Sequence, residues 1–256
     1  MKIQYMSDLH LEFPENREYF RVNPIDPIGD VLILAGDIIC DTYREEANDF
    51  FQDIESKFKF IISTMGNHEF YFGNTSYAYP SYEKYLSDNH IMLNNKSIVI
   101  DNVRFIVSVL WSQIDPLHQV EISQRLNDYK LIRKNVGAGT EIISVDDTNY
   151  YHQISKEFIE KELNDNFKGK NVLVTHHLPS FDCIDPKWKN STLLSAFANH
   201  LDDLILKNKI DSWIFGHQHE QFNSLIGKTK MLSNPLGYAK EANFRDFNSQ
   251  SLFELN

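Results

Sequence analysis

Five short clusters of carboxylate, amide and imidazole side chains stand out because each one follows an apolar run. In chain order they are Asp8-Leu9-His10, Gly36-Asp37, Gly66-Asn67-His68-Glu69, His176-His177 and Gly216-His217-Gln218-His219. Six of the ten histidines lie in these clusters. Oxygen and imidazole ligands of this kind suit Mn, Fe or Zn, and the thiolates typical of a closed structural zinc site are absent from them. Two such ions about 4 Å apart can share one carboxylate and bind a phosphoryl group between them.

Each cluster taken alone has an ordinary structural explanation. A Gly-Asp pair after a strand is usually a turn, Gly-Asn-His-Glu can be a turn with a helix cap, and a histidine is often a hydrogen-bonded core residue. The five together are much harder to explain in this way, because all of them follow predicted strands. In an extended segment, residues two apart point the same way, which would bring together Asp8 with His10 and His217 with His219. The glycines directly before Asp37, Asn67 and His217 permit tight turns and close backbone approach.

The apolar runs before the clusters predict buried strands at 31–35, 58–64, 172–175 and 212–215. Helical patterns lie between them, at about 43–57, 79–88, 148–166 and 192–208. Two further pairs of runs, within 97–110 and 222–232, predict hairpins. Because strands and helices alternate, we expect a mixed α/β sandwich whose sheets are flanked by helices. We expect one domain over 1–256, with a polar insertion at about 112–150 packed near the site.

Composition narrows the class of protein. The chain has 256 residues and a formal net charge of −11, which disfavours a stable complex with nucleic acid. Its two cysteines, Cys40 and Cys183, are not in a CxxC spacing and predict free thiols in a reducing compartment. We find neither a signal-peptide pattern nor an apolar stretch of about 18 residues, so we expect a cytoplasmic protein that does not bind membranes.

The order of the five clusters resembles the motif order of the calcineurin-like metallophosphoesterase superfamily, and no element is missing between Asp8 and His219. The resemblance implies a four-layer αββα sandwich and the hydrolysis of phosphate esters by a hydroxide that bridges two metal ions. It implies that one ion is bound by Asp8, His10 and His219, the other by Asn67, His176 and His217, and that both are bridged by Asp37. The ions themselves stay open between Mn, Fe and Zn.

His68 has a different implied role from the metal ligands. By resemblance it would lie near the phosphate, as a general acid for the leaving alkoxide or as a stabiliser of developing charge. Its ordinary pKa near 6.5 suits proton donation at neutral pH. Of the pair at 176 and 177, the first histidine is the expected ligand, and His177 is expected to line the pocket or to contact a ligand.

The substrate is less well defined. Protein phosphatases of this superfamily carry arginines beside the second and third clusters, and this chain has none there. We therefore expect a small or nucleotide-like phosphomonoester or phosphodiester. The segment 127–133 resembles a bacterial subfamily of mostly unassigned substrate, and its Lys130 and Arg133 are candidate cations for the substrate anion. Tyr71 is a candidate to stack on a nucleobase, although an aromatic residue after a strand is more often part of the core.

Two rival functions are considered beside hydrolysis of a small ester. A non-catalytic, protein-binding scaffold can use the same fold, but such relatives tend to lose metal ligands or the histidine at position 68, and this chain retains them all. A nuclease would have to bind a polyanion with an acidic surface. The oligomeric state is not readable from the sequence.

Overall fold

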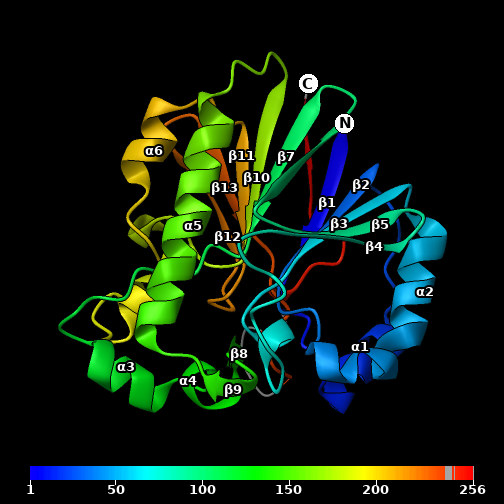
Figure 1. Ribbon diagram of the computed structural model, residues 1–256. Helices are drawn as coiled ribbons and strands as arrows, with labels where there is room; N and C mark the ends of the chain where they lie inside the picture. Colours follow the sequence, from blue (N-terminus) through cyan, green and yellow to red (C-terminus); the bar gives the residue numbers. More distant parts are fainter. Residues whose placement is uncertain (240–243, 245, 256) are drawn as a thin grey trace.

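The computed structural model describes residues 1–239, 244 and 246–255. Two stacked β-sheets form its centre, with helices on both outer faces (Figure 1). The first sheet has six strands, in the order β14 (Leu252–Glu254), β1 (Lys2–Met6), β2 (Val31–Ala35), β3 (Phe60–Thr64), β5 (His90–Asn94) and β4 (Tyr82–Ser87). The four central strands are parallel, and both edge strands are antiparallel to their neighbours.

The second sheet repeats this plan. Its six strands have the order β12 (Phe222–Ile226), β13 (Thr229–Ser233), β11 (Ser212–Phe215), β10 (Lys170–Thr175), β7 (Val103–Ser108) and β6 (Lys96–Ile100). The central four are again parallel, and the edges are antiparallel. The two edge pairs, β6–β7 and β12–β13, are the hairpins predicted from the sequence.

Apolar side chains on both faces of each sheet explain the layered arrangement. Ile33, Phe105 and Val174 belong to the cluster between the sheets. On the outer face of the first sheet lie α1 (Pro14–Val22) and α2 (Asn48–Lys57), and on that of the second lie α5 (Val145–Asn164) and α6 (Asp202–Lys207) (Figure 1). Continuous apolar strands are expected where both faces of a sheet are covered. The predicted αββα sandwich is confirmed.

Two of the helices expected from the sequence are not formed as predicted. The segment 79–88 contains β4, because it pairs with the neighbouring strand β5 through a turn at Asp88–Asn89. The segment 192–208 contains only a short 3₁₀ turn at Leu194–Ala196 and the helix α6. Between these two, Asn199 donates its backbone N–H to Leu178 O over 2.9 Å, so a backbone bond to another segment replaces helical bonds.

Residues 112–150 form small elements at one end of the sandwich. They include α3 (Gln119–Arg125), α4 (Asp128–Leu131) and a hairpin of β8 (Arg133–Val136) and β9 (Gly139–Ile142), followed by the start of α5. Ser144 and Asp147 form a capping box at that start. The division into one domain with an insertion stays a prediction. In the part of the chain that the structure describes, no helix is long and apolar enough to cross a membrane.

The two ends of the chain meet at the first sheet. β14 pairs with β1, and Ser7 forms an isolated bridge with Pro235. Leu236 N–H donates to Ser7 O over 3.1 Å, and Gly237 N–H donates to Asp8 O over 3.0 Å. The loop after β1, which carries the first sequence cluster, is therefore held by residues from the other end of the sequence.

Candidate metal centre

All five sequence clusters meet at one edge of the sandwich because each follows the carboxyl end of a central parallel strand. The first three follow β1, β2 and β3 of the first sheet, and the last two follow β10 and β11 of the second. Carboxyl ends of parallel strands are the usual place for ligand sites in such sheets. The side chains so placed are Asp8, His10, Asp37, Asn67, His68, His176, His177, His217 and His219.

The backbone at these clusters is strained. Five of the seven expected metal ligands have positive φ, with values from 46° at His10 to 75° at His217. These five are Asp8, His10, Asp37, His217 and His219. Non-glycine residues adopt this left-handed conformation at a cost, and such residues concentrate at functional sites. The sequence argument that Asp8 with His10, and His217 with His219, lie in extended segments is therefore wrong. β1 ends at Met6 and β11 at Phe215, and left-handed turns aim these side chains.

The first group of potential ligands consists of Asp8, His10 and His219, whose ligand atoms lie within 4.8 Å of one another. His10 Nε2 is 2.9 Å from His219 Nε2, and His219 Nε2 is 3.6 Å from Asp8 Oδ1. The Asp8 carboxylate also accepts the backbone N–H of His217 at 2.9 Å. A Cβ atom at Gly216 would lie 2.5 Å from Asp8 Oδ2, so glycine is required there.

The second group brings together several lone pairs. His176 Nδ1 is 3.0 Å from Ala35 O, which assigns the proton to Nδ1 and leaves a lone pair on Nε2. That Nε2 lies 3.2 Å from Asn67 Oδ1, 3.1 Å from His217 Nδ1 and 3.4 Å from Asp37 Oδ2. Oxygen and nitrogen acceptors that converge in this way repel one another unless a cation or a proton lies between them.

Asp37 lies between the two groups. Its Oδ2 is 3.4 Å from His176 Nε2 of the second group and 3.9 Å from His10 Nε2 of the first. Its Oδ1 accepts the backbone N–H of His68 at 2.8 Å, which orients the carboxylate. A Cβ atom at Gly66 would overlap that same Oδ1, so glycine at this position makes room for the carboxylate.

The residues present fit a pair of divalent cations. Both groups contain imidazole nitrogens and carboxylate oxygens that face one another across short distances. Burial opposes charging of His176, but Asp37 outweighs it and raises the pKa of His176 to about 10, so the surroundings of Asp37 favour positive charge. Two divalent ions at these groups would supply that charge, and the ligand types suit Mn, Fe or Zn.

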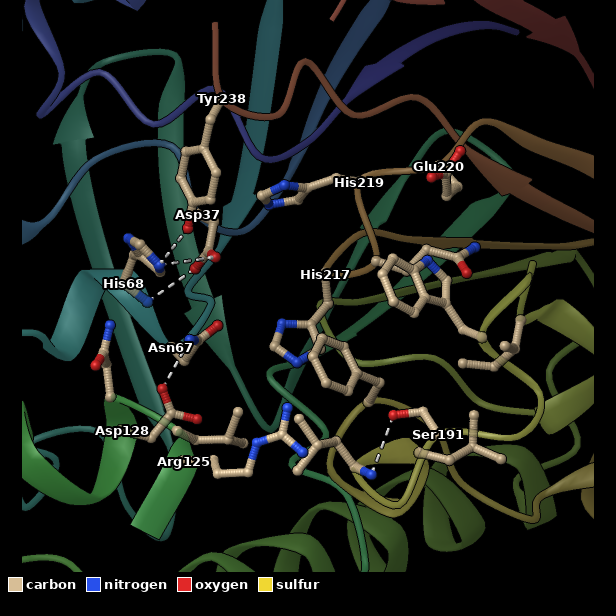
Figure 2. A pocket seen from close by; sticks show the side chains of 18 of the residues that line it. Asp37, Asn67, His68, Arg125, Asp128, Ser191, His217, His219, Glu220 and Tyr238 are labelled. Atoms are coloured by element: carbon tan, nitrogen blue, oxygen red, sulfur yellow. Dashed lines mark hydrogen bonds and ion pairs between the residues drawn. The ribbon is translucent and has the colours of Figure 1, made fainter. Parts of the chain in front are cut away.

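Asn67 is oriented by a residue of the 112–150 segment. Its Nδ2 donates to Asp128 Oδ1 at 2.9 Å and lies 3.2 Å from Tyr71 Oη, so its Oδ1 faces His176. Tyr71 Oη also donates to Asp128 Oδ1, at 2.8 Å. Asp128 is buried, and its carboxylate therefore fixes which end of the Asn67 amide faces the metal centre (Figure 2).

His68 is oriented by Glu12. Glu12 Oε1 is 2.7 Å from His68 Nδ1 and 3.2 Å from His10 Nδ1. The other ring nitrogen, His68 Nε2, lies 3.2 Å from Tyr238 Oη and 4.0 Å from Asp37 Oδ2. Burial opposes the imidazolium, but Asp37 and Glu12 outweigh it and raise the pKa of His68 to about 9. His68 Nε2 therefore lies on the side of the ring that faces Asp37 (Figure 2).

Four other residues were candidates for substrate contact. Tyr71 lines the cavity at the metal centre, stacked on His68 with ring centroids 4.1 Å apart. His177 is buried between Trp111 and His217 and does not line that cavity. Lys130 and Arg133 are exposed and also lie outside the described lining of the cavity. The structure thus places Arg125, rather than these two cations, beside the site.

Sequence reasoning missed Glu12 and Asp128. Glu12 continues the two-residue spacing of Asp8 and His10, and this spacing could have indicated that Glu12 belongs to the same site. Asp128 stands in the segment 127–133, where attention went to the cations. No local pattern marks Asp128 as a partner of Asn67, because 61 positions of sequence separate the two residues.

A cavity of about 860 Å³ opens from the metal centre. Asp37, Asn67 and His68 lie on one side of it, and Ser191 and Glu220 lie across it (Figure 2). Cavities of this size accommodate drug-sized molecules. A phosphoryl group at Asp37 would therefore leave room for a large remainder of a substrate.

Two stacked mixed sheets thus carry two neighbouring groups of potential metal ligands at the carboxyl ends of their strands. The family model for calcineurin-like phosphoesterases matches residues 1–221, and the chain belongs to this family. The family is dinuclear and metal-dependent, so the protein is an enzyme that hydrolyses phosphoesters with the help of metal ions. This confirms the resemblance found in the sequence.

The chain is also similar to several individual proteins. An uncharacterized protein, L509, of Acanthamoeba polyphaga mimivirus is 31% identical over 279 aligned positions, covering 99% of this chain and 96% of that protein. The phosphopantetheinyl hydrolase PptH of Mycobacterium tuberculosis has a similar fold, with a TM-score of 0.67 at 14% identity over 96% of this chain and 92% of that chain. A dimetal phosphatase from Danio rerio aligns with a TM-score of 0.44 at 14% identity over 91% of this chain and 86% of that one.

Proposed function

We propose that the protein hydrolyses small phosphomonoesters or phosphodiesters by a two-metal mechanism at the site around Asp37. The observation that supports this most directly is the position of Asp37 Oδ2 between His10 Nε2 and His176 Nε2, at 3.9 and 3.4 Å. When bound, two divalent cations would neutralise the phosphoryl oxygens and lower the pKa of water to near neutrality. The proposed ligands are Asp8, His10, Asp37, Asn67, His176, His217 and His219.

The residues around the ligands would orient them. Asp128 holds the Asn67 amide with its oxygen toward the second group, at a bond of 2.9 Å. Glu69 accepts the backbone N–H groups of Gly66 at 2.6 Å and Asp37 at 2.9 Å, which ties the second cluster to the third. Binding and orientation of a phosphoryl group in this way supply much of the rate enhancement in phosphoryl transfer.

His68 would donate a proton to the leaving alkoxide. His68 Nδ1 donates its proton to Glu12 Oε1, with 2.7 Å between the two atoms. A second proton, on Nε2, would therefore face the substrate. Burial lowers the pKa of His68 and the two neighbouring carboxylates raise it, so an imidazolium is available at neutral pH. Cations bound at Asp37 would cancel part of that increase, which brings the group toward the range where general acids work well.

A turnover assay tests this function. Metal-loaded protein is given p-nitrophenyl phosphate and bis-p-nitrophenyl phosphate with added Mn²⁺, and release of p-nitrophenol is followed. A wider set of nucleotides, cyclic nucleotides and phosphosugars then separates a monoesterase from a diesterase. We expect turnover of at least one of the two p-nitrophenyl esters. Absence of hydrolysis together with absence of metal uptake would overturn the proposal and favour a binding scaffold.

A further inference from the structure

The cavity at the metal centre has an apolar wall. Leu126, Ile184, Trp188, Leu193, Leu194 and Phe197 all line it. The wall begins beside the metal centre, because the ring of Phe197 lies 4.7 Å from the ring of His217, centroid to centroid. A group attached to a phosphoryl at Asp37 would therefore meet apolar side chains as soon as it extends outward.

Trp188 is the most exposed part of this wall. Half of its surface, 50%, is accessible, although its indole borders the cavity. The other two tryptophans, Trp111 and Trp213, are buried in separate core clusters. A large apolar side chain left exposed at the rim of a cavity is typical of a binding surface for an apolar ligand group.

The charges of the cavity argue against a highly anionic substrate. The arginine and lysine side chains among its described lining residues are Arg125 and Lys187. Arg125 Nη1 is paired with Glu121 at 2.7 Å, and Lys187 is paired with Glu220. Against them stand the carboxylates of Asp37, Asp128, Glu220 and Asp246. Away from the metal centre, the carboxylates of the described lining therefore outnumber its arginine and lysine side chains, which disfavours the binding of a second phosphate.

Resting on the proposed function, we propose that the substrate is a phosphoester whose organic part carries an extended apolar group, and that this group lies on the wall formed by Trp188, Leu193, Leu194 and Phe197. The phosphoryl end lies at Asp37, and the apolar group displaces water from the wall. This substrate class is distinct from nucleoside polyphosphates and from nucleic acid, whose remainder is anionic.

Alkylphosphonates test the wall directly, because their P–C bond is not hydrolysed. Methyl-, butyl- and octylphosphonate are titrated into Mn²⁺-loaded protein while the tryptophan emission is followed, and their inhibition constants are measured against the p-nitrophenyl ester that is turned over. Each buried methylene strengthens binding severalfold, so on a half-open wall we expect octylphosphonate to bind about 30-fold more tightly than methylphosphonate.

Two wall variants and one control locate the effect. Trp188→Ala and Leu193→Ala should weaken octylphosphonate about tenfold more than methylphosphonate, and the first should also abolish the emission change. The matched control is Leu225→Ala on β12, a leucine that is 61% exposed and outside the described cavity lining, which should keep the dependence on chain length.

The outcomes separate this inference from the proposed function. If an ester is hydrolysed but the affinity of the phosphonates does not change with chain length, the apolar wall is not a substrate site, while the hydrolase assignment stands. The same conclusion holds if the length dependence persists in both wall variants. If no ester is hydrolysed and no metal is taken up, the proposed function fails, and the emission titration still decides whether the wall binds apolar phosphonates.

Discussion

Asp128 Oδ1 accepts a hydrogen bond of 2.9 Å from Asn67 Nδ2, and this bond connects the 112–150 segment to the metal centre. We predict that Asp128→Asn weakens the binding of one of the two metal ions about 10- to 100-fold, because the amide lacks the charge that strengthens this bond and can turn its NH2 group toward Asn67. Metal content after dialysis and calorimetric titration with Mn²⁺ measure this. Asp146→Asn, an exposed change in the same segment, is the control, and equal affinities in the two variants would refute the role of Asp128.

Glu12 and His68 are expected to act as a pair. His68→Ala should lower kcat about 10²- to 10⁴-fold and leave the metal content intact, because the ring donates a proton but binds no ion. Glu12→Gln should lower kcat less, roughly 10- to 100-fold, with little change in KM, since the ring keeps its place but loses the fixed tautomer.

A double variant of Glu12 and His68 tests whether Glu12 acts by orienting His68 or whether its substitution damages the fold in general. If Glu12 acts through His68, adding Glu12→Gln to His68→Ala should cost little further activity. Glu15→Gln, an exposed carboxylate in the first turn of α1, is the control. Loss of metal together with activity in the His68 variant would contradict its assignment as a proton donor.

Metal removal should destabilise the protein. Asp8 and Asp37 are 0% and 2% exposed, and buried carboxylates without cations are costly. A cation present at about 100 times its Kd adds about 2.7 kcal/mol, which raises Tm by about 5 to 10 °C in a chain of this size. Scanning calorimetry with EDTA and with Mn²⁺ measures the shift. The shift should shrink in Asp37→Asn, and an unchanged Tm in the parent protein would argue against tight binding.

His90 lies outside the metal centre and should make the free energy of unfolding depend on pH. It is buried, with Nδ1 2.8 Å from Glu55 Oε1 and Nε2 3.0 Å from Ser63 Oγ. Burial lowers the pKa of His90 to about 4, although Glu55 opposes this. The unfolded chain binds the proton near pH 6.5 and the folded chain only near 4, so stability falls as pH drops between these values, by up to roughly 3 kcal/mol.

Urea unfolding at pH 7 and pH 4.5 measures this dependence. His90→Gln should unfold more easily at pH 7 and show a smaller loss at pH 4.5 than the parent protein. His200→Gln, at an exposed position, serves as the control. If the parent and the His90 variant lose the same free energy of unfolding over this range, other groups carry the pH dependence.

The strands and the order of the clusters were predictable because buried parallel strands have continuous apolar sequences. Val31–Ala35 and Ser212–Phe215 are buried throughout and end directly before site residues. Side chains placed at such ends must lie at one edge of a sheet, whatever the details of the turns. The family resemblance rested on the same local information.

Interactions between distant segments were not predictable. The segment 79–88 has helical spacing of its aromatic residues, but pairing with β5 overrides that preference. Lys130 and Arg133 were plausible as cations by type, and only the folded structure shows that they lie outside the described lining of the cavity. The partners of Asn67 and His68 depend on where a loop folds back, and a residue type alone does not encode that position.

The pairing of β14 with β1, and the bonds from Leu236 and Gly237 to the Ser7–Asp8 loop, have a practical meaning. A fragment ending at residue 221, where the family match stops, would retain every proposed ligand and yet lack the segments that anchor the loop of the first one. We expect recombinant fragments cut at that boundary to be poorly folded despite an intact set of motifs. The part of the chain that carries the motifs would therefore be shorter than the part that is needed for stable folding.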